Sequence, residues 1–126
     1  MTKIIAEIGW NHMGDIELAE KMISEAKKSG ADYAKFQTWS VKNLKSGSWD
    51  NDGRRQIYEQ AELTHTKHLE LIKICEKYEI DFLTSVFNSD DVEFVSTLIN
   101  SIKIPSSEMN NQELWRNHIN VNVSDR

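Results

Sequence analysis

Hydrophobic residues at the start of the chain change from a short β-branched run to a longer stretch with helical spacing. Residues 3–8 form the first run and predict a β-strand. Asp15 follows a glycine and predicts a helix N-cap, and Gly30 predicts the left-handed residue that ends the helix, which we expect to cover residues 15–29. One side of this predicted helix carries residues spaced four apart, namely Leu18, Met22 and Ala26.

The same alternation of strand and helix continues along the chain. The next predicted strands cover residues 33–37, 80–87, 102–104 and 119–123. The helices predicted between them cover residues 54–63, a stretch capped by Thr64 that ends near Tyr78, a stretch capped by Asn88 or Ser89, and 112–116. The second of these carries Leu69, Leu71 and Ile72, and the third is expected to bury Val92, Val95 and Leu98. A polar stretch at 40–53 is unusually long for such a connection and predicts a functional loop.

Two architectures fit this order of elements, because strands that alternate with helices predict a parallel sheet. A doubly wound sheet has a glycine-rich phosphate-binding turn after its first strand, and the spacing of Gly9 and Gly14 does not match that fingerprint. A barrel instead has polar functional residues at the carboxyl end of each strand, as four predicted strands have here. We therefore predict an α/β fold of the (β/α)8 barrel type, with the first four to five βα units in this 126-residue chain.

Composition narrows the classes of function. A net charge of -5 with interspersed signs disfavours nucleic acid as a partner. We also expect no membrane insertion, because no apolar run approaches the roughly 20 residues that span a bilayer. The N-terminus lacks the pattern of a secretory signal, so we expect a cytoplasmic protein. The single cysteine, Cys75, lies in a helical pattern and is expected to be a buried structural residue.

Polar residues gather at the predicted strand ends. They are Glu7, Lys35, Gln37, Thr84, Ser85, Lys103, Ser106 and Glu108. In a closed barrel these ends face one shared opening, where two lysines with nearby hydroxyls can bind a phosphate or carboxylate. The two glutamates can transfer protons or bind sugar hydroxyls. A single lysine at a strand end is more often solvated or paired with a glutamate, but agreement among four strands favours an anion site.

The histidines and tryptophans have simpler interpretations. His12, in the loop after the first strand, is expected to fix the turn or contact substrate rather than bind a metal. His65 and His68 lie three apart at a helix start, and we expect both at the surface because barrel helices lie outside the strands. The tryptophans lie in or beside loops, where they can shield a pocket or, more commonly, fill the base of the loop; they are Trp10, Trp39, Trp49 and Trp115.

Four ordered segments of the sequence resemble one enzyme family. They are AEIGWNHMGD at 6–15, SGADYAKFQTW at 29–39, YEQAEL at 58–63 and KIPSSEMNN at 103–111. Together, and up to about Leu114, they resemble the sialic acid synthase (N-acetylneuraminate synthase) family. The resemblance implies a (β/α)8 barrel followed by a small antifreeze-like domain. It also implies condensation of phosphoenolpyruvate with an N-acetylmannosamine-type sugar to a nonulosonic acid, a step of surface polysaccharide biosynthesis.

The resemblance also implies roles for the residues at the strand ends. The phosphate and carboxylate of phosphoenolpyruvate would be held by Lys35, Ser85, Lys103 and Ser106. Gln37 and Glu108 would contact the sugar, and Glu7 would be the catalytic group that handles protons beside the reacting centre. The resemblance further implies a homodimer and a divalent Mn or Mg ion in the full-length protein. The two histidine ligands of the family are not found in this chain, so we expect no metal ligands here.

Two segments depart from the family pattern. The residues Thr84-Ser85-Val86-Phe87 replace Ser-Thr-Pro-Phe, and Pro105 and Ser107 replace small residues on either side of Ser106. These changes suggest a divergent subfamily with a related sugar, such as a legionaminic-type precursor.

The pattern is lost after Leu114, so we expect an incomplete and inactive fragment without the second half of the barrel and the antifreeze-like domain. Two alternatives remain. One is a non-catalytic half-barrel that binds an anion or self-associates through its open sheet edges. The other is a barrel with different phosphate-handling lyase or isomerase chemistry, although Gln37 with Glu108 favours a polyhydroxylated partner.

Overall fold

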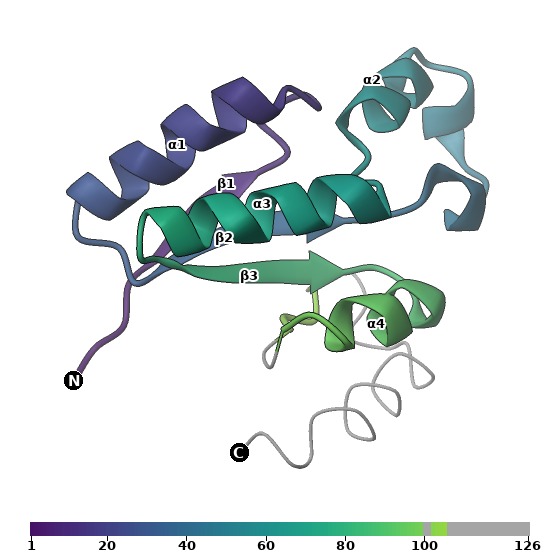
Figure 1. The fold of residues 1–126 in the computed structure, drawn as a ribbon. Coiled ribbons are helices and arrows are strands. Elements are labelled where there is room, and N and C mark those ends of the chain that lie inside the picture. The colour runs from purple at the N-terminus through teal and green to yellow at the C-terminus, as the bar shows by residue number, and fades with distance from the viewer. Residues whose placement is uncertain (100–101, 106–126) are drawn as a thin grey trace.

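The fold is a parallel sheet with helices between successive strands (Figure 1). The computed structural model describes residues 1–99 and 102–105. Its strands are β1 (Ile5–Gly9), β2 (Tyr33–Thr38) and β3 (Asp81–Val86), paired in the order β1-β2-β3. Its helices are α1 (Ile16–Lys28), α2 (Arg54–Ala61), α3 (His65–Lys77) and α4 (Ser89–Ser96). Two short 3₁₀ turns, η1 (Val41–Asn43) and η2 (Ser48–Asp50), lie within the predicted polar loop.

The segment after α4 continues the sheet on the free side of β3. Lys103 forms a parallel bridge with Ser85, in which its N–H donates to the carbonyl of Thr84 over 3.0 Å. In a doubly wound sheet the fourth strand would instead return to the side of β1. The strand order therefore agrees with a barrel, although the predicted strand at 102–104 is described as a single bridge.

The predicted number of βα units exceeds what the structure describes. Three parallel strands are described where four to five units were predicted. The predicted helix at 112–116 and strand at 119–123 lie outside the described residues.

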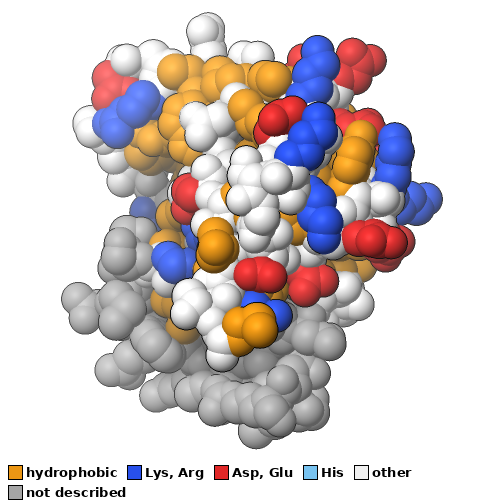
Figure 2. Space-filling view, turned by 90° about the vertical axis from the view of Figure 1, so that its left-hand side faces the viewer, with side chains coloured by type: hydrophobic (Ala, Val, Ile, Leu, Met, Phe, Trp, Pro, Cys, Tyr) orange, Lys and Arg blue, Asp and Glu red, His pale blue; other side chains and the backbone are white. Residues whose placement is uncertain are grey.

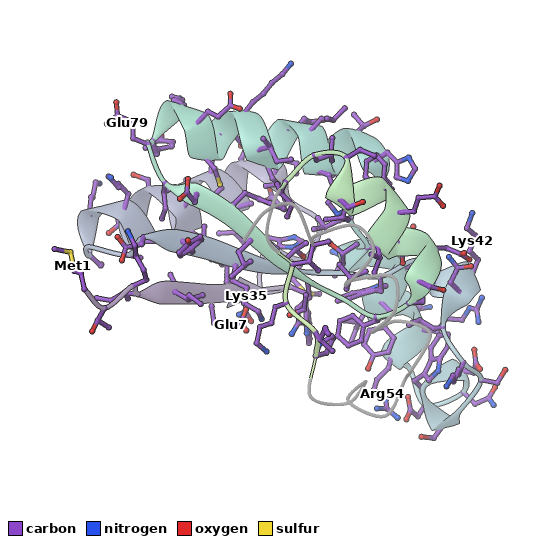
Figure 3. The ribbon with its side chains drawn as sticks, turned by 90° about the horizontal axis from the view of Figure 1, so that it is seen from below. Met1, Glu7, Lys35, Lys42, Arg54 and Glu79 are labelled. Atoms are coloured by element: carbon purple, nitrogen blue, oxygen red, sulfur yellow. The ribbon has the colours of Figure 1, made fainter. Side chains whose placement is uncertain are left out.

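Helices α1 and α3 lie side by side over one face of the sheet (Figure 1). The strand positions that face them are apolar, and they form the core together with the inner sides of both helices. Its main members are Ile8, Ala34, Phe36, Phe82, Ile23 and Leu71. Because side chains alternate along a strand, the intervening residues point to the opposite face. Glu7 and Lys35 are among these, and Figure 3 shows them directed away from the two helices.

The helix caps predicted from the sequence agree with the structure. Asp15 caps α1 by accepting a hydrogen bond from the N–H of Leu18 over 3.2 Å. Thr64 and Asn88 cap α3 and α4 in the same way, with donor–acceptor distances of 3.2 and 3.1 Å. Gly30 follows α1 with a φ of 91°, the left-handed conformation that was predicted. Helix α2, in contrast, ends at Ala61 rather than at residue 63.

The structure decides which apolar residues of α1 and α3 are buried, which the helical spacing in the sequence had left open. In α1 the buried residues are Ala19, Ile23 and Ala26, whereas Leu18 is 36% exposed. In α3 Leu71 is buried and Leu69 is 47% exposed. Apolar residues lie on more than one side of each helix, so contact with the sheet and with the neighbouring helix selects the side that is buried. In α4, Val92 and Val95 are buried as predicted, and Leu98 lies beyond the helix end and is half-buried.

The end of the molecule where α1 and α3 finish is charged and solvated. Figure 2 faces this end and shows Lys and Arg side chains interspersed with Asp and Glu. Glu20 accepts hydrogen bonds of 2.9 Å from both the Lys77 ammonium and the Tyr78 hydroxyl, which ties the two helices together. None of the described helices combines the length and apolarity that crossing a membrane requires.

Candidate active site

The strand register brings five of the predicted site residues together near the carboxyl ends of the strands. They lie on the face of the sheet opposite α1 and α3, which we call the helix-free face. Glu7 of β1 lies beside Lys35 of β2. Two residues further along β2, Gln37 lies beside Ser85 of β3, which is bridged to Lys103. Residues two apart on a strand share a face, so these side chains form two neighbouring rows. The structure therefore supports the predicted grouping of polar residues from separate strands.

Lys35 forms a direct ion pair with Glu7 (Figure 3). The Lys35 side chain is only 5% exposed, whereas the Glu7 side chain is 55% exposed. A buried ammonium needs such a partner, because taking an isolated charge out of water is costly. The plainer interpretation of a strand-end lysine, pairing with a glutamate, thus holds for Lys35. Its ammonium carries three donors, so it can keep Glu7 and still bind a second anion.

Thr84 does not belong to this face, although the sequence placed it with Ser85 at the strand end. Its hydroxyl lies 2.8 Å from the hydroxyl of Thr38, on the side of the sheet that faces the helices. The Thr38 hydroxyl also lies 2.8 Å from Nε2 of His68. The alternation of side chains along β3 explains the difference, because neighbours on a strand point to opposite faces. The hydroxyl of β3 on the helix-free face therefore belongs to Ser85, which is buried.

His68 is buried against the sheet, so the prediction of a surface position was wrong. It is 1% exposed, and its Nδ1 lies 2.8 Å from the carbonyl oxygen of Thr64. Because a carbonyl can only accept, Nδ1 carries the proton and Nε2 accepts from Thr38. Burial lowers the pKa of His68 and outweighs the opposing effect of the Thr64 carbonyl. Two threonines at otherwise apolar, helix-facing strand positions were the available signal for this network.

His12 fixes the loop between β1 and α1, which was one of its two predicted roles. Its ring is fully buried, and Nδ1 accepts a hydrogen bond from the N–H of Gly14 over 2.9 Å. Burial, and to a smaller extent the charge of Lys67, lower the pKa of His12. The ring is then neutral with its proton on Nε2, which has no hydrogen-bond partner among the described residues. His65, in contrast, is exposed as predicted, and its ring stacks on Phe94.

An aromatic pocket of about 210 Å³ lies beside this site. Its apolar walls come from Trp10, Trp39, Leu44, Trp49, Tyr58 and Phe87, and Gln37 and Lys45 also line it. The elements that supply the walls are the loops that follow β1, β2 and β3, together with α2. Both uses predicted for the tryptophans are seen, because these three line the pocket and also pack in one hydrophobic cluster with Val41 and Ala61. Trp115 lies outside the described residues. We call this feature the tryptophan pocket.

Some predicted site residues and the predicted metal cannot be placed. Ser106 and Glu108 lie outside the described residues, so their roles stay predictions. Within residues 1–99 and 102–105, no three His, Cys, Asp or Glu side chains form a group that could hold a metal ion. Glu7, the carboxylate at this face, is already engaged by Lys35. The described residues therefore do not supply a site for the divalent ion, and we assign no step to it.

Comparison with known proteins identifies the family. The NeuB family model matches residues 22–123. The N,N'-diacetyllegionaminic acid synthase of Campylobacter jejuni is 38% identical over 123 residues, which cover 87% of this chain and 36% of that protein. The N-acetylneuraminate-9-phosphate synthase of Homo sapiens is 35% identical over 123 residues, covering 86% of this chain and 33% of that protein.

A solved structure supports the same assignment. The sialic acid synthetase of Leptospira borgpetersenii, determined in complex with citrate, superposes with a TM-score of 0.80 at 26% identity. The match covers 94% of this chain and 41% of that one. The chain thus spans about a third of the length of the curated relatives. From the family model, the relatives and the shared parallel α/β fold, we conclude that this chain belongs to the NeuB family.

Proposed function

We propose that this chain supplies the phosphoenolpyruvate-binding strands of a nonulosonic acid synthase. Such an enzyme condenses phosphoenolpyruvate with an N-acylated amino sugar and releases phosphate. The observation that carries the proposal is the pair of rows on the helix-free face, with Glu7 beside Lys35 and Gln37 beside Ser85 and Lys103. The names of the relatives, synthases of N-acetylneuraminate-9-phosphate and of diacetyllegionaminic acid, support it.

The charges of these residues suit a phosphorylated carboxylic acid. Lys35 and Lys103 provide two cations, and Ser85 supplies a hydroxyl beside Lys103, one row further along the strands than Lys35. Hydrogen bonds to charged groups each contribute about 1.5–3 kcal/mol, more than neutral ones. The low exposure of Lys35 strengthens its attraction for an anion, because a buried site has a lower effective dielectric constant than water. Ser106 is assigned to the same anion by its predicted role.

The proposed reaction joins two carbon atoms and breaks one carbon–oxygen bond. Carbon 3 of phosphoenolpyruvate attacks the aldehyde carbon of the open-chain sugar, whose oxygen takes up a proton and becomes a hydroxyl. Water then adds to carbon 2, and phosphate leaves with the bridging oxygen to give the keto acid. We assign Glu7 to proton exchange beside Lys35, and Gln37 with Glu108 to the sugar hydroxyls. The Mn or Mg ion, the homodimer and the cytoplasmic location stay predictions.

The test is a calorimetric titration of the 126-residue chain with phosphoenolpyruvate. We expect Lys35→Met and Lys103→Met each to weaken binding at least tenfold, which corresponds to about 1.4 kcal/mol. Lys77→Met is the matched control, since Lys77 carries the same charge at the opposite end of α3, where it pairs with Glu20. Circular dichroism checks that each variant is folded. Equal affinities for all four proteins, or no binding by the folded wild-type chain, would contradict the proposal.

A further inference from the structure

The tryptophan pocket offers mainly carbon surface to a ligand. The indole N–H of Trp39 donates to the carbonyl of Tyr58 over 2.9 Å, and that of Trp49 donates to the carbonyl of Lys45 over 2.8 Å. Neither N–H is therefore free to bind a polar ligand group. The other polar groups of the lining residues are the side chains of Gln37 and Lys45, the Tyr58 hydroxyl and the indole N–H of Trp10.

The walls of the pocket hold one another in place. The Trp39 ring packs edge-on against Tyr58 and Phe87, with centroid distances of 5.8 and 6.3 Å. The Trp49 and Tyr58 ring centroids are 5.6 Å apart, and the guanidinium of Arg55 lies 5.6 Å from the centre of the Trp49 ring. Trp39 is also buried. Aromatic walls that are fixed in this way form a binding surface before the ligand arrives, which reduces the entropy lost on binding.

Size and position restrict what the pocket can hold. Its 210 Å³ is below the roughly 300 Å³ at which pockets for whole small ligands begin, so it suits one substituent of a larger ligand. Gln37 lines the pocket and also lies beside Ser85 in the row next to the Glu7–Lys35 pair. A sugar held by Gln37 would therefore direct a neighbouring substituent into it. A hydroxyl or phosphate that faces the aromatic walls would lose its bonds to water, and the engaged indole N–H groups of Trp39 and Trp49 would not replace them.

We propose that the tryptophan pocket binds a methyl group of the amino sugar. This inference rests on the proposed function, from which it takes the sugar as substrate. The methyl group can come from an N-acyl substituent, which the names of both sequence relatives contain, or from the terminal carbon of a deoxy sugar. One methyl-sized group in an apolar pocket changes selectivity by roughly 10–200-fold, so the pocket determines which sugar is preferred.

The experiment is saturation-transfer NMR on the 126-residue chain, with irradiation of the aromatic protons. The probes are N-acetylmannosamine and its 6-deoxy analogue, each added in the presence of phosphoenolpyruvate. We expect the strongest transfer to a methyl group. The deoxy analogue separates the two sources, because its acetyl and terminal methyl signals are resolved. Binding of phosphoenolpyruvate is followed in the same tube by phosphorus NMR, which tests the anion site independently.

Variants of the pocket complete the test. Leu44→Phe narrows the pocket and is expected to weaken sugar binding at least about tenfold while leaving phosphoenolpyruvate binding unchanged. Trp49→Phe is the milder second variant, should Leu44→Phe fail to fold, and is expected to reduce the transfer to the methyl group. Tyr78→Phe is the control, since Tyr78 is an aromatic residue at the end of α3, away from the pocket, where it bonds to Glu20. It is expected to leave sugar binding and the transfer to the methyl group unchanged.

Three results would overturn the inference. They are saturation spread evenly over the sugar ring, full sugar binding by a folded Leu44→Phe variant, and absence of sugar binding by the wild-type chain. If phosphoenolpyruvate does not bind while the sugar methyl group still receives saturation, the proposed anion site is wrong and the pocket inference is supported.

Discussion

Replacing Gly14 by alanine should destabilise the protein far more than replacing Gly30. Both glycines have left-handed backbones, with φ values of 83° and 91°. A Cβ on Gly14 would lie 2.1 Å from the backbone carbonyl oxygen of Gln60, whereas a Cβ on Gly30 would meet no described atom within 4 Å apart from its chain neighbours. Both substitutions therefore place an alanine in a left-handed backbone conformation, but only Gly14→Ala also creates a steric clash.

The magnitudes can be worked out from these two environments. A left-handed alanine costs about 1–2 kcal/mol. Restriction of the unfolded chain returns about 0.4–1 kcal/mol, so Gly30→Ala should lose roughly 1 kcal/mol. At Gly14 overpacking adds about 1–3 kcal/mol, because the nearest atom belongs to the backbone and cannot rotate away. Gly14→Ala should therefore lose roughly 2–4 kcal/mol.

The assay is urea-induced unfolding followed by tryptophan fluorescence and by far-ultraviolet circular dichroism. The slopes of free energy against urea concentration should agree among the three proteins, so that the midpoints report stability directly. If both variants unfold at the same midpoint, then the loop after β1 does not pack against the end of α2 as the structure shows. The comparison needs no assumption about function, since neither glycine belongs to the proposed anion site.

Three further predictions concern buried polar groups. Glu7→Gln should destabilise the chain by about 1–3 kcal/mol in urea unfolding, because it leaves the Lys35 ammonium buried without a counter-charge. The loss stays below that for a fully buried ion pair, because Glu7 is half exposed. A larger loss of stability in Lys35→Met than in Glu7→Gln would contradict this reasoning. Burial lowers the pKa of His68 below its usual 6.5, so the unfolded chain binds the proton more readily and stability should fall as the pH drops below 6.5. His68→Gln should reduce that slope in urea titrations between about pH 7 and pH 5, and an unchanged slope would refute the prediction. The Cys75 thiol is buried and its pKa is raised to about 12, so iodoacetamide should label it only as the chain unfolds. Labelling is followed by mass spectrometry, and rapid labelling of the native protein would contradict this prediction.

Features that depend on neighbouring residues could be predicted well from the sequence. The caps Asp15 and Thr64 were predicted, and Asn88 was one of two candidates with Ser89, because such a cap bonds to a backbone N–H three residues further on. Gly30 was predicted for a similar reason, since its conformation follows from the end of one helix. Cys75 was also expected to be buried, and it is.

Features that depend on how elements rotate against one another could not be predicted in this way. His68 was placed at the surface because barrel helices lie outside the strands, yet every such helix also has an inner side. The bonds of His68 to Thr38 and Thr64 show that it lies on that inner side. Leu18 and Leu69 show the same dependence, since each belongs to a helical stripe of apolar residues and yet lies outside the buried side of its helix.

The candidate site combines both kinds of information. The sequence by itself determined the order of strands and helices and the polar residues at the strand ends, because these follow from spacing within single elements. Only the tertiary structure decided that Glu7 contacts Lys35, that Thr84 turns to the helices, and that aromatic rings from separate loops enclose a pocket beside Gln37. Glu7 and Lys35 are 28 residues apart, and their contact depends on the register of two strands. Register and rotation are set by packing between distant segments, which no local pattern contains.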